Sequence, residues 1–556
     1  MKYWFSEKKK ILTVTIILTL VASSSFFVGF TLSDPEYFFK INKSIDIFGR
    51  VYREITMNYV DEIDPEKFME AGIDGLLGTL DPYTNFISEK EADEVELITV
   101  GKYGGIGVTI GVRDGYITIL SLMEGYSAQK QGIQPGDRIL EIDGVQVTGS
   151  KPENIRSMTR GEPGTELRLK VERDSEPKPL EFVVVREEIQ LKNITYADFA
   201  QDGIAYIRID RFSRGAGDEL GLAIKDLKLK GPIKGVVLDL RNNPGGLLDV
   251  AVNVVEKFVA KGNLVVSTRG RMQDSEKKFF VLTDPMLPDV PLIVLVNRQS
   301  ASASEIVAGA IQDLDRGIII GTRSFGKGLV QTITPLVYNT QLKITTAKYY
   351  TPSGRCIQEI DYMHKNKDGV FATTPDSLKK KFKTLNGRLE LEAGGILPDT
   401  IVMEPDHSAL YNELIRKSMF FKFATGYVSA HKEIPSMLSD SLLNDFQQFL
   451  ISQKFTYQDE VETKLKELCD LSEKCKYSES IRKEIDRLKN DLTADKEKNL
   501  VRYKDEILST LKPEIVSRYR GEKGRIEETL KSDNQVIAAI GLLLNDGEYK
   551  HRLNVR

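Results

Sequence analysis

Three serines at the start of a helical pattern form the first group of residues that could do chemistry. Ser300, Ser302 and Ser304 alternate with alanines, and Glu305–Gln312, which follows, has its apolar residues on one helical stripe. A helix N-terminus offers unpaired backbone N–H groups and the positive end of the helix dipole, and both stabilise a developing oxyanion. Serine is also a favoured N-cap residue, so a purely structural role stays open for each of the three.

A lysine in a glycine-rich loop is the second such group. Lys327 lies between Gly326 and Gly328, and glycine permits positive φ and a close backbone approach, although Gly-Lys-Gly turns are also common on protein surfaces. A lysine amine acts as a base only when it is neutral, and burial lowers its pKa from the reference value of about 10.4. Because none of the four histidines lies in any of these motifs, we expect Lys327 to take the proton of an attacking serine.

The elements that must position these groups are predicted to be buried parallel strands. The runs Pro291–Asn297, Gly317–Gly321 and Gly235–Leu240 are short, apolar and rich in β-branched residues. The serines follow the first run, the lysine follows the second, and Arg241-Asn-Asn-Pro-Gly-Gly246 follows the third. Since the carboxyl ends of parallel strands meet at one sheet edge, we expect the three loops to converge. The third loop is either a plain β-to-α turn or a source of backbone amides for an oxyanion hole.

These three loops resemble those of the carboxy-terminal processing (tail-specific) proteases, which are Ser/Lys enzymes. The resemblance rests on Ser-Ala-Ser-Ala-Ser-Glu at 300–305, Phe-Gly-Lys-Gly at 325–328 followed by Gln331, and Leu-Arg-Asn-Asn-Pro-Gly-Gly at 240–246. It implies an α/β catalytic core like those of Clp protease and crotonase, working without a cofactor. The site residues that it implies are Ser302 as nucleophile, Lys327 as base, Gln331 as an assisting group, and the amides of Ala303 and of Gly245 or Gly246 as oxyanion donors.

Residues 98–190 form a second recognisable unit. Tyr103-Gly-Gly-Ile-Gly107 leads into strand-like residues, and Ser127–Gly144 ends in Gly-Asp-Arg-Ile-Leu-Glu-Ile-Asp-Gly. This unit resembles a PDZ domain, in which a glycine-lined loop turns backbone amides toward a peptide's terminal carboxylate and a strand edge adds the peptide as a further strand. The resemblance implies that a substrate's C-terminus binds at Gly104, Gly105, Ile106 and Gly107.

The N-terminal segment predicts export. Ile11–Leu32 carries no charge and is long enough to cross a hydrocarbon core of about 30 Å, and four lysines precede it. This asymmetry places the N-terminus in the cytoplasm. The segment is either a membrane anchor or a signal peptide cleaved near Ala22-Ser23-Ser24. We therefore expect an inner-membrane protein that faces the periplasm, or a periplasmic protein.

Composition excludes several classes of protein. The chain has 556 residues, 28% of them charged, with 77 basic against 81 acidic residues and a net charge of −4, so nothing predicts nucleic acid as a partner. The histidines and the three cysteines show no metal-ligand spacing, and we expect no metal. Cys469 and Cys475 stand six positions apart in a helical region, beyond the roughly 7 Å Cα separation that a disulfide tolerates.

The predicted domain organisation combines these units. We expect an anchor or signal at 1–32, a helical segment at 43–97, the PDZ domain at 98–190 as a mainly-β insertion, the α/β protease core at 191–405 and a helical domain at 406–556. The lysine-rich stretch 365–386 is interpreted as a solvated loop or insertion. The C-terminal charge runs are interpreted as solvated faces, with homo-oligomerisation through helical segments as a further possibility.

Three functions from different classes fit parts of the chain. The first is an endopeptidase that binds a protein's free C-terminus and cleaves nearby through Ser302 and Lys327. The second is a catalytically silent PDZ scaffold, which a replaced Ser302, Lys327 or Gln331 would favour, and none is replaced. The third is a penicillin-recognising Ser-x-x-Lys enzyme, whose spacing occurs at Ser275 and Ser377, but in polar surroundings that do not open an apolar helix.

Overall fold

The computed structural model describes residues 35–91, 97, 99–365, 371–373, 375–431, 433, 441–475 and 479–555. The predicted membrane anchor or signal peptide lies outside these ranges. Among the residues that are described, no helix is both long enough and apolar enough to span a membrane. The chain divides into two compact units, Met1–Phe86 and Ile87–Arg556, which we describe separately.

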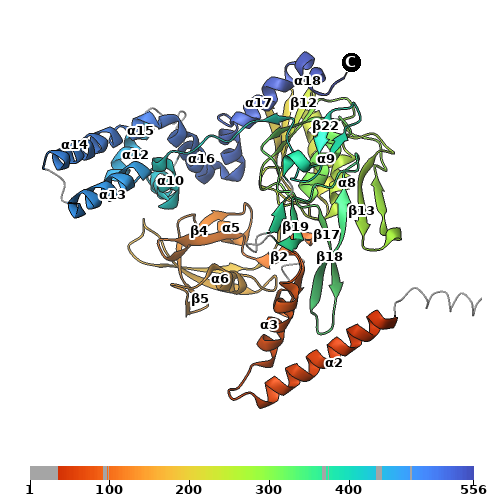
Figure 1. The fold of residues 1–556 in the computed structure, drawn as a ribbon. Coiled ribbons are helices and arrows are strands. Elements are labelled where there is room, and N and C mark those ends of the chain that lie inside the picture. The colour runs from red at the N-terminus through yellow and green to blue at the C-terminus, as the bar shows by residue number, and fades with distance from the viewer. Residues whose placement is uncertain are drawn as a thin grey trace, which may run out of the picture. The chain divides into compact units, whose positions relative to one another are not determined.

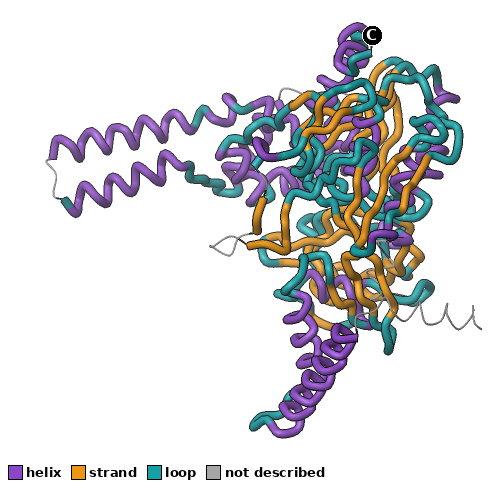
Figure 2. The backbone as a smooth tube through the Cα atoms, turned by 45° about the vertical axis from the view of Figure 1, so that its right-hand side comes forward, coloured by secondary structure: helices purple, strands orange, loops and turns teal. Residues whose placement is uncertain are grey.

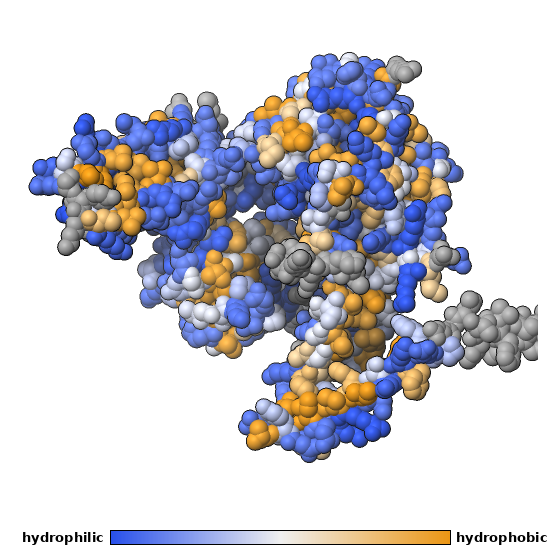
Figure 3. All heavy atoms as spheres, viewed as in Figure 1, coloured by the Kyte–Doolittle hydropathy of each residue, from blue (hydrophilic) through white to orange (hydrophobic). Residues whose placement is uncertain are grey.

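The first unit contains a pair of helices, α2 (Pro35–Asn58) and α3 (Pro65–Leu77). Tyr52 stacks on Phe68 with ring centroids 5.5 Å apart, and its hydroxyl donates to the Pro65 carbonyl over 2.7 Å. Asp64 caps α3 by accepting from the amides of Glu66 and Lys67. Figure 3 shows apolar residues gathered along these helices. The exposed apolar side chains of α2 include Tyr37, Phe38, Phe39, Ile45, Phe48 and Val51.

A mostly parallel sheet lies at the centre of the second unit (Figure 1). Its strand order is β10-β11-β12-β15-β16-β23, with only β10 and β11 antiparallel. The strands are β10 (Ile194–Gln201), β11 (Ile204–Ile209), β12 (Gly235–Asp239), β15 (Leu292–Val296), β16 (Ile318–Gly321) and β23 (Thr400–Ile401). The three runs predicted from the sequence are thus the adjacent strands β12, β15 and β16.

Helices cover both faces of this sheet, which explains why its strands are apolar throughout. One face packs against α7 (Ala216–Lys230), α8 (Leu248–Val255) and α9 (Ala303–Asp313). The other packs against α17 (Asn534–Leu543) and α18 (Asp546–Arg552). Within one strand the side chains alternate between these cores: Val294 of β15 faces the first, while Ile293 and Leu295 face the second.

A smaller antiparallel sheet supports the loop that contains the lysine. The loop runs directly into β17 (Leu329–Pro335), which pairs with β18 (Gln341–Tyr350). β18 in turn pairs with β13 (Leu264–Gly270), and β13 pairs with β14 (Lys277–Phe280). The remaining short elements are β1 (Asn85–Ile87), η1 (Glu89–Glu91), η2 (Gln273–Ser275), β19 (Ile360–Lys365), β20 (Phe371–Thr373), η3 (Asp376–Leu378), β21 (Lys381–Lys383) and β22 (Leu389–Leu391). The lysine-rich stretch 365–386 therefore contains short elements of its own.

Residues between β1 and the central sheet form a separate β-rich domain with its own core. Its sheet has the order β3-β4-β5-β7-β8, and β6 pairs with β5. Strands β2 and β9 pair with each other. The elements are β2 (Lys102–Gly105), β3 (Val108–Arg113), β4 (Tyr116–Leu122), α5 (Ser127–Lys130), β5 (Arg138–Ile142), β6 (Val145–Gln146), α6 (Pro152–Thr159), β7 (Glu166–Glu172), β8 (Leu180–Val185) and β9 (Glu187–Gln190). β3 stands at the end of the sheet, next to α6.

The C-terminal stretch is helical over its described length, and its helices contribute to two different cores. The first core is formed by α10 (Ala409–Arg416), α11 (Met419–Ala430), α12 (Ser441–Ser452), α15 (Asn499–Arg502) and the first part of α16 (Lys504–Thr529). Two further helices, α13 (Glu460–Lys474) and α14 (Glu479–Lys496), pack against each other and contribute no residue to this core; Figure 2 draws all of these helices in purple. Gly521 breaks α16 with a φ of 62°. Beyond it, Ile526 and the helices α17 and α18 join the core of the central sheet. The end of the chain therefore belongs structurally to the α/β core.

Candidate active site

Ser302 lies at the carboxyl edge of the central sheet as the N-cap residue of α9, with a φ of 54° and a ψ of −113°. A residue other than glycine rarely adopts a positive φ. Residues held in such a backbone conformation cluster at functional sites. Two contacts fix the conformation: the Ser302 amide donates to Glu305 Oε2 over 2.8 Å, and the Tyr349 hydroxyl donates to the Ser302 carbonyl over 3.2 Å. Hydrogen bonds from and to neighbouring side chains therefore stabilise the strained backbone conformation of Ser302.

The three serines have different surroundings, and Ser302 is the one that is partly exposed. Ser300 is fully buried, and its Oγ donates to the Leu240 carbonyl over 2.8 Å. Ser304 is also fully buried, and its Oγ donates to the Asn243 carbonyl over 2.9 Å. Ser300 and Ser304 thus tie the α9 N-terminus to the neighbouring loop, which supports Ser302 as the nucleophile.

One buried carboxylate joins the serine loop to the lysine loop. Glu305 is fully buried, and its Oε2 accepts from the amides of both Ser302 (2.8 Å) and Lys327 (2.9 Å). Its Oε1 accepts from the Ser324 hydroxyl (2.5 Å) and the Gly326 amide (2.7 Å). Burial raises the pKa of Glu305 above its usual value, while these four hydrogen bonds act in the opposite direction. The sequence analysis assigned this residue no role, although Ser-x-x-Glu before an apolar run is the signature of a capping box.

The lysine loop depends on its glycines. Gly326 has a φ of +88°, and a Cβ there would lie 2.7 Å from Glu359 Cβ. The backbone also pairs directly with the serine loop, since the Phe325 amide donates to the Ser300 carbonyl over 3.0 Å. Lys327 is half-buried at this position. Gln331 lies on β17, where its Nε2 donates to Thr345 Oγ1 of the neighbouring strand over 3.1 Å.

The third loop lies against the serine, as the sequence analysis predicted. A Cβ at Gly245 would lie 2.6 Å from the Ala301 carbonyl oxygen and 2.8 Å from the Ala303 nitrogen. Of the two glycine amides, that of Gly245 donates to Asn243 Oδ1 over 2.8 Å. Ala303 begins α9, where backbone amides lack an intrahelical acceptor.

A separate groove of about 180 Å³ lies between β3 and α6. Gly105, Ile106 and Gly107 line it, as do apolar residues of β3 and two arginines of α6 and its C-terminus, Arg156 and Arg160. Gly104 does not line the groove, because its backbone packs against the Gly161 carbonyl, where an added Cβ would lie at 1.9 Å. β3 is the edge strand of its sheet, so a peptide can be added beside it.

The two Ser-x-x-Lys spacings belong to no comparable site. Ser275 lies in the short turn η2 and Ser377 in the short turn η3, and neither begins an α-helix. Among the described residues, no group of three or more histidine, cysteine or acidic side chains is arranged to hold a metal ion. A partly exposed serine at a helix N-terminus, a lysine loop bound by the same carboxylate and adjacent backbone amides together form an arrangement that suits a serine peptidase.

Comparisons with known proteins identify the family. Residues 203–364 match Peptidase family S41, residues 118–173 match the PDZ domain, and residues 410–543 match a helical domain described as "Probable PDZ-protease, C-terminal helical domain". The chain is 41% identical over 321 residues to a carboxy-terminal-processing protease of Bartonella bacilliformis, covering 57% of this chain and 73% of that one. The chain therefore belongs to the carboxy-terminal processing serine proteases of peptidase family S41.

Two further similarities concern a curated relative and a solved structure. The chain is 32% identical over 321 residues to the carboxy-terminal processing protease CtpB of Bacillus subtilis, covering 57% of this chain and 66% of that one. A solved photosystem II D1 C-terminal processing protease aligns with 24% identity and a TM-score of 0.35, covering 64% of this chain and 92% of that one. The predicted family, the fold class of an α/β core with a PDZ domain and flanking helices, and the peptidase activity are confirmed by the family matches.

Proposed function

We propose that this protease binds the free C-terminus of a protein substrate in the PDZ groove and cleaves the substrate as an endopeptidase through Ser302 and Lys327. The proposal rests on one observation: the backbone amides of Ser302 and Lys327 both donate to the same oxygen, Glu305 Oε2. A shared anchor keeps nucleophile and base in a fixed relation, which is the geometric requirement of this chemistry.

In the proposed reaction, the Ser302 hydroxyl attacks the substrate carbonyl carbon and its proton passes to the neutral Lys327 amine. The Ala303 and Gly246 amides stabilise the oxyanion of the tetrahedral intermediate. The intermediate collapses, the peptide C–N bond breaks, and Lys327 returns the proton to the leaving amine. Water then attacks the acyl ester and gives a proton to Lys327. The ester C–O bond breaks, Lys327 returns that proton to Ser302 Oγ, and the new carboxyl terminus is released. Gln331, which is hydrogen-bonded to β18, positions the lysine loop.

Blocking the substrate's C-terminus should slow cleavage. A carboxylate bound by backbone amides forms charge-assisted hydrogen bonds, whose loss costs about 1.5–3 kcal/mol. We therefore expect kcat/KM for a protein substrate to fall on the order of 10-fold or more when its C-terminal carboxylate is amidated. The matched measurement uses the same substrate with a free C-terminus, together with a short peptide ester that needs no PDZ binding. Equal kcat/KM for the free and amidated substrates would contradict C-terminal capture.

We also propose that the chain is exported and faces the periplasm, either anchored by Ile11–Leu32 or released after cleavage of that segment. The uncharged length of this segment and the lysines before it support the proposal. In cells stripped of the outer membrane, added proteinase should digest the protein while a cytoplasmic marker stays intact. Protection of both proteins until the inner membrane is lysed would contradict export.

A further inference from the structure

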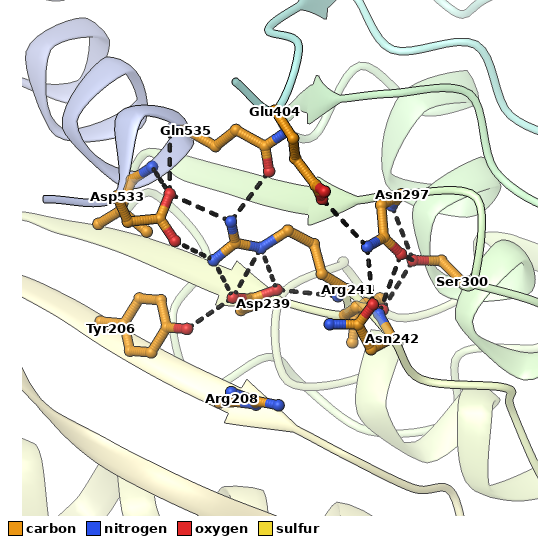
Figure 4. A network of polar contacts seen from close by, with 12 residues as sticks. Tyr206, Arg208, Asp239, Arg241, Asn242, Asn297, Ser300, Glu404, Asp533 and Gln535 are labelled. Atoms are coloured by element: carbon orange, nitrogen blue, oxygen red, sulfur yellow. Dashed lines mark hydrogen bonds and ion pairs between the residues drawn. The ribbon is translucent and has the colours of Figure 1, made fainter. Parts of the chain in front are cut away.

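Arg241 connects the oxyanion loop to the C-terminal end of the chain (Figure 4). It begins the loop that leads to Gly245 and Gly246, and its guanidinium lies between Asp239 of β12 and Asp533, the N-cap of α17. Arg241 contacts Asp239 over 2.5 Å and Asp533 over 2.8 Å, and it also donates to Gln535 Oε1 over 2.9 Å. All of these side chains are at least mostly buried.

The contact with Asp533 differs from the contact with Asp239. Asp239 holds Arg241 within the sheet itself and also accepts from the Tyr206 hydroxyl over 2.5 Å. Burial alone would raise the pKa of Asp239, but Arg241 and these hydrogen bonds lower it, so the carboxylate stays charged. Asp533 contacts Arg241 from α17, outside the sheet. This second contact therefore fixes the orientation of the Arg241 side chain relative to the loop that it begins.

The loop beyond Arg241 is hydrogen-bonded to the residues that precede Ser302. The Asn242 amide donates to Asn297 Oδ1 over 3.0 Å, and the Asn243 carbonyl accepts from the Ala301 amide over 3.1 Å. Gly245 packs against the Ala301–Ala303 backbone. A shift of Arg241 would therefore move the amides that face the attacked carbonyl. Misplacement by about 1 Å can cost on the order of 100-fold in rate.

Helix α17 does not need the Asp533 charge to stay in place. Its apolar face is buried against the sheet through Val536, Ala539 and Leu543. Gln535 Nε2 donates to the Val402 carbonyl over 2.7 Å, and Asn534 Nδ2 donates to the Met403 carbonyl over 2.8 Å. Asp533 also caps the helix by accepting from the Gln535 and Val536 amides, a role that asparagine or serine fills equally well. The position of α17 on the sheet therefore does not depend on the negative charge of Asp533.

We propose that Asp533 is a positioning residue of the protease, which acts through Arg241 to keep the oxyanion amides of the Gly245–Gly246 loop aligned with Ser302. The C-terminal segment beyond Gly521 is thus part of the structure that completes the active site. The inference rests on the proposed function, since it requires Ser302 to be the nucleophile and this loop to supply oxyanion donors.

The test compares Asp533→Asn and Asp533→Ser with the unmodified full-length chain. Both substitutions keep an N-cap acceptor and remove the charge that faces Arg241. We expect kcat to fall on the order of 10- to 100-fold, and the rate of Ser302 labelling by a fluorophosphonate to fall in parallel, because both depend on the oxyanion amides. KM and the affinity of the PDZ groove for a C-terminal peptide should stay unchanged. Because loss of a mostly buried charge also lowers Tm, kcat is compared per folded molecule.

Asp546→Asn is the matched control, because Asp546 is an acidic residue at the start of α18 that forms only an exposed pair with Lys550. It should leave every measured quantity unchanged. Unaltered kcat and labelling in both Asp533 variants, a rise in KM alone, or a loss of activity that matches a loss of Tm would overturn the inference. Ser302→Ala separates it from the proposed function: an active Ser302→Ala variant refutes both proposals, whereas an inactive one beside fully active Asp533 variants refutes the inference alone.

Discussion

Ser302→Ala and Lys327→Ala should each lower kcat by at least about 10³-fold while the protein stays folded. The serine hydroxyl is a weak nucleophile without a base. Glu305, the carboxylate nearest in sequence, already accepts four hydrogen bonds through its two oxygens. Lys327→Arg should be equally inactive, because an arginine side chain stays protonated in proteins. The double variant Ser302→Ala/Lys327→Ala should be no slower than either single variant, since the two residues act as one unit.

Steady-state kinetics and circular dichroism of each variant would test this prediction. In the unmodified protein the rate should rise with pH as a single group loses its proton, and this titration should disappear in Lys327→Ala. Lys343→Ala is a matched control, because Lys343 lies on β18, the strand paired with β17, and outside the loop at 322–328. Near-normal turnover of Lys327→Ala would show that a different group is the base.

Glu305→Gln should be the second most damaging single substitution. The carboxylate accepts four hydrogen bonds from the two catalytic loops, whereas a glutamine amide offers one oxygen and a nitrogen that can only donate. Each buried donor left without an acceptor costs about 1–3 kcal/mol. We expect Tm to fall measurably and the kcat of the folded fraction to fall on the order of 100-fold, since the Ser302 and Lys327 backbones lose their common anchor.

Glu256→Gln provides the comparison for Glu305→Gln. Glu256 is also a buried glutamate, but it accepts from the Leu282 amide, outside the three loops. A glutamine oxygen can keep that contact, so we expect near-normal kcat and only a small fall in Tm. Activity measured on samples of known folded fraction would distinguish the two effects. If Glu305→Gln lost stability but kept full kcat per folded molecule, Glu305 would have no part in positioning the catalytic groups.

The sequence predicted those parts of the site that lie in continuous motifs. The apolar runs before Ser300, Arg241 and Lys327 predicted adjacent parallel strands, because a strand covered on both faces must be apolar throughout. The positive φ of Ser302 could not be predicted, since it arises from contacts with Glu305 and Tyr349. Glu305 carried a local signal in the capping-box spacing, whereas Tyr349 is one residue of an ordinary β-strand pattern.

Contacts between segments that are distant in the sequence, such as that of Arg241 with Asp533, could not be predicted for a different reason. The sequence predicted a helical domain at 406–556, and α17 (Asn534–Leu543) is one of its helices. Periodicity shows that a helix has an apolar face, but it does not show which surface that face will cover. The pairing of Arg241 with Asp533 follows only from the position of α17 on the sheet.

The helices that bury the second face of the central sheet, α17 and α18, also affect the order in which the core can form during translation. The strands of this sheet end at β23 (Thr400–Ile401), whereas the helices that bury its second face, α17 and α18, are translated only after the whole helical domain that lies between. Chains emerge from the ribosome amino end first. An emerging chain therefore holds Ser302 and Lys327 long before it has Asp533, and its sheet stays open to water on one side until the last helices arrive. The last helices to be translated thus provide both the apolar cover of this face and the carboxylate that contacts Arg241.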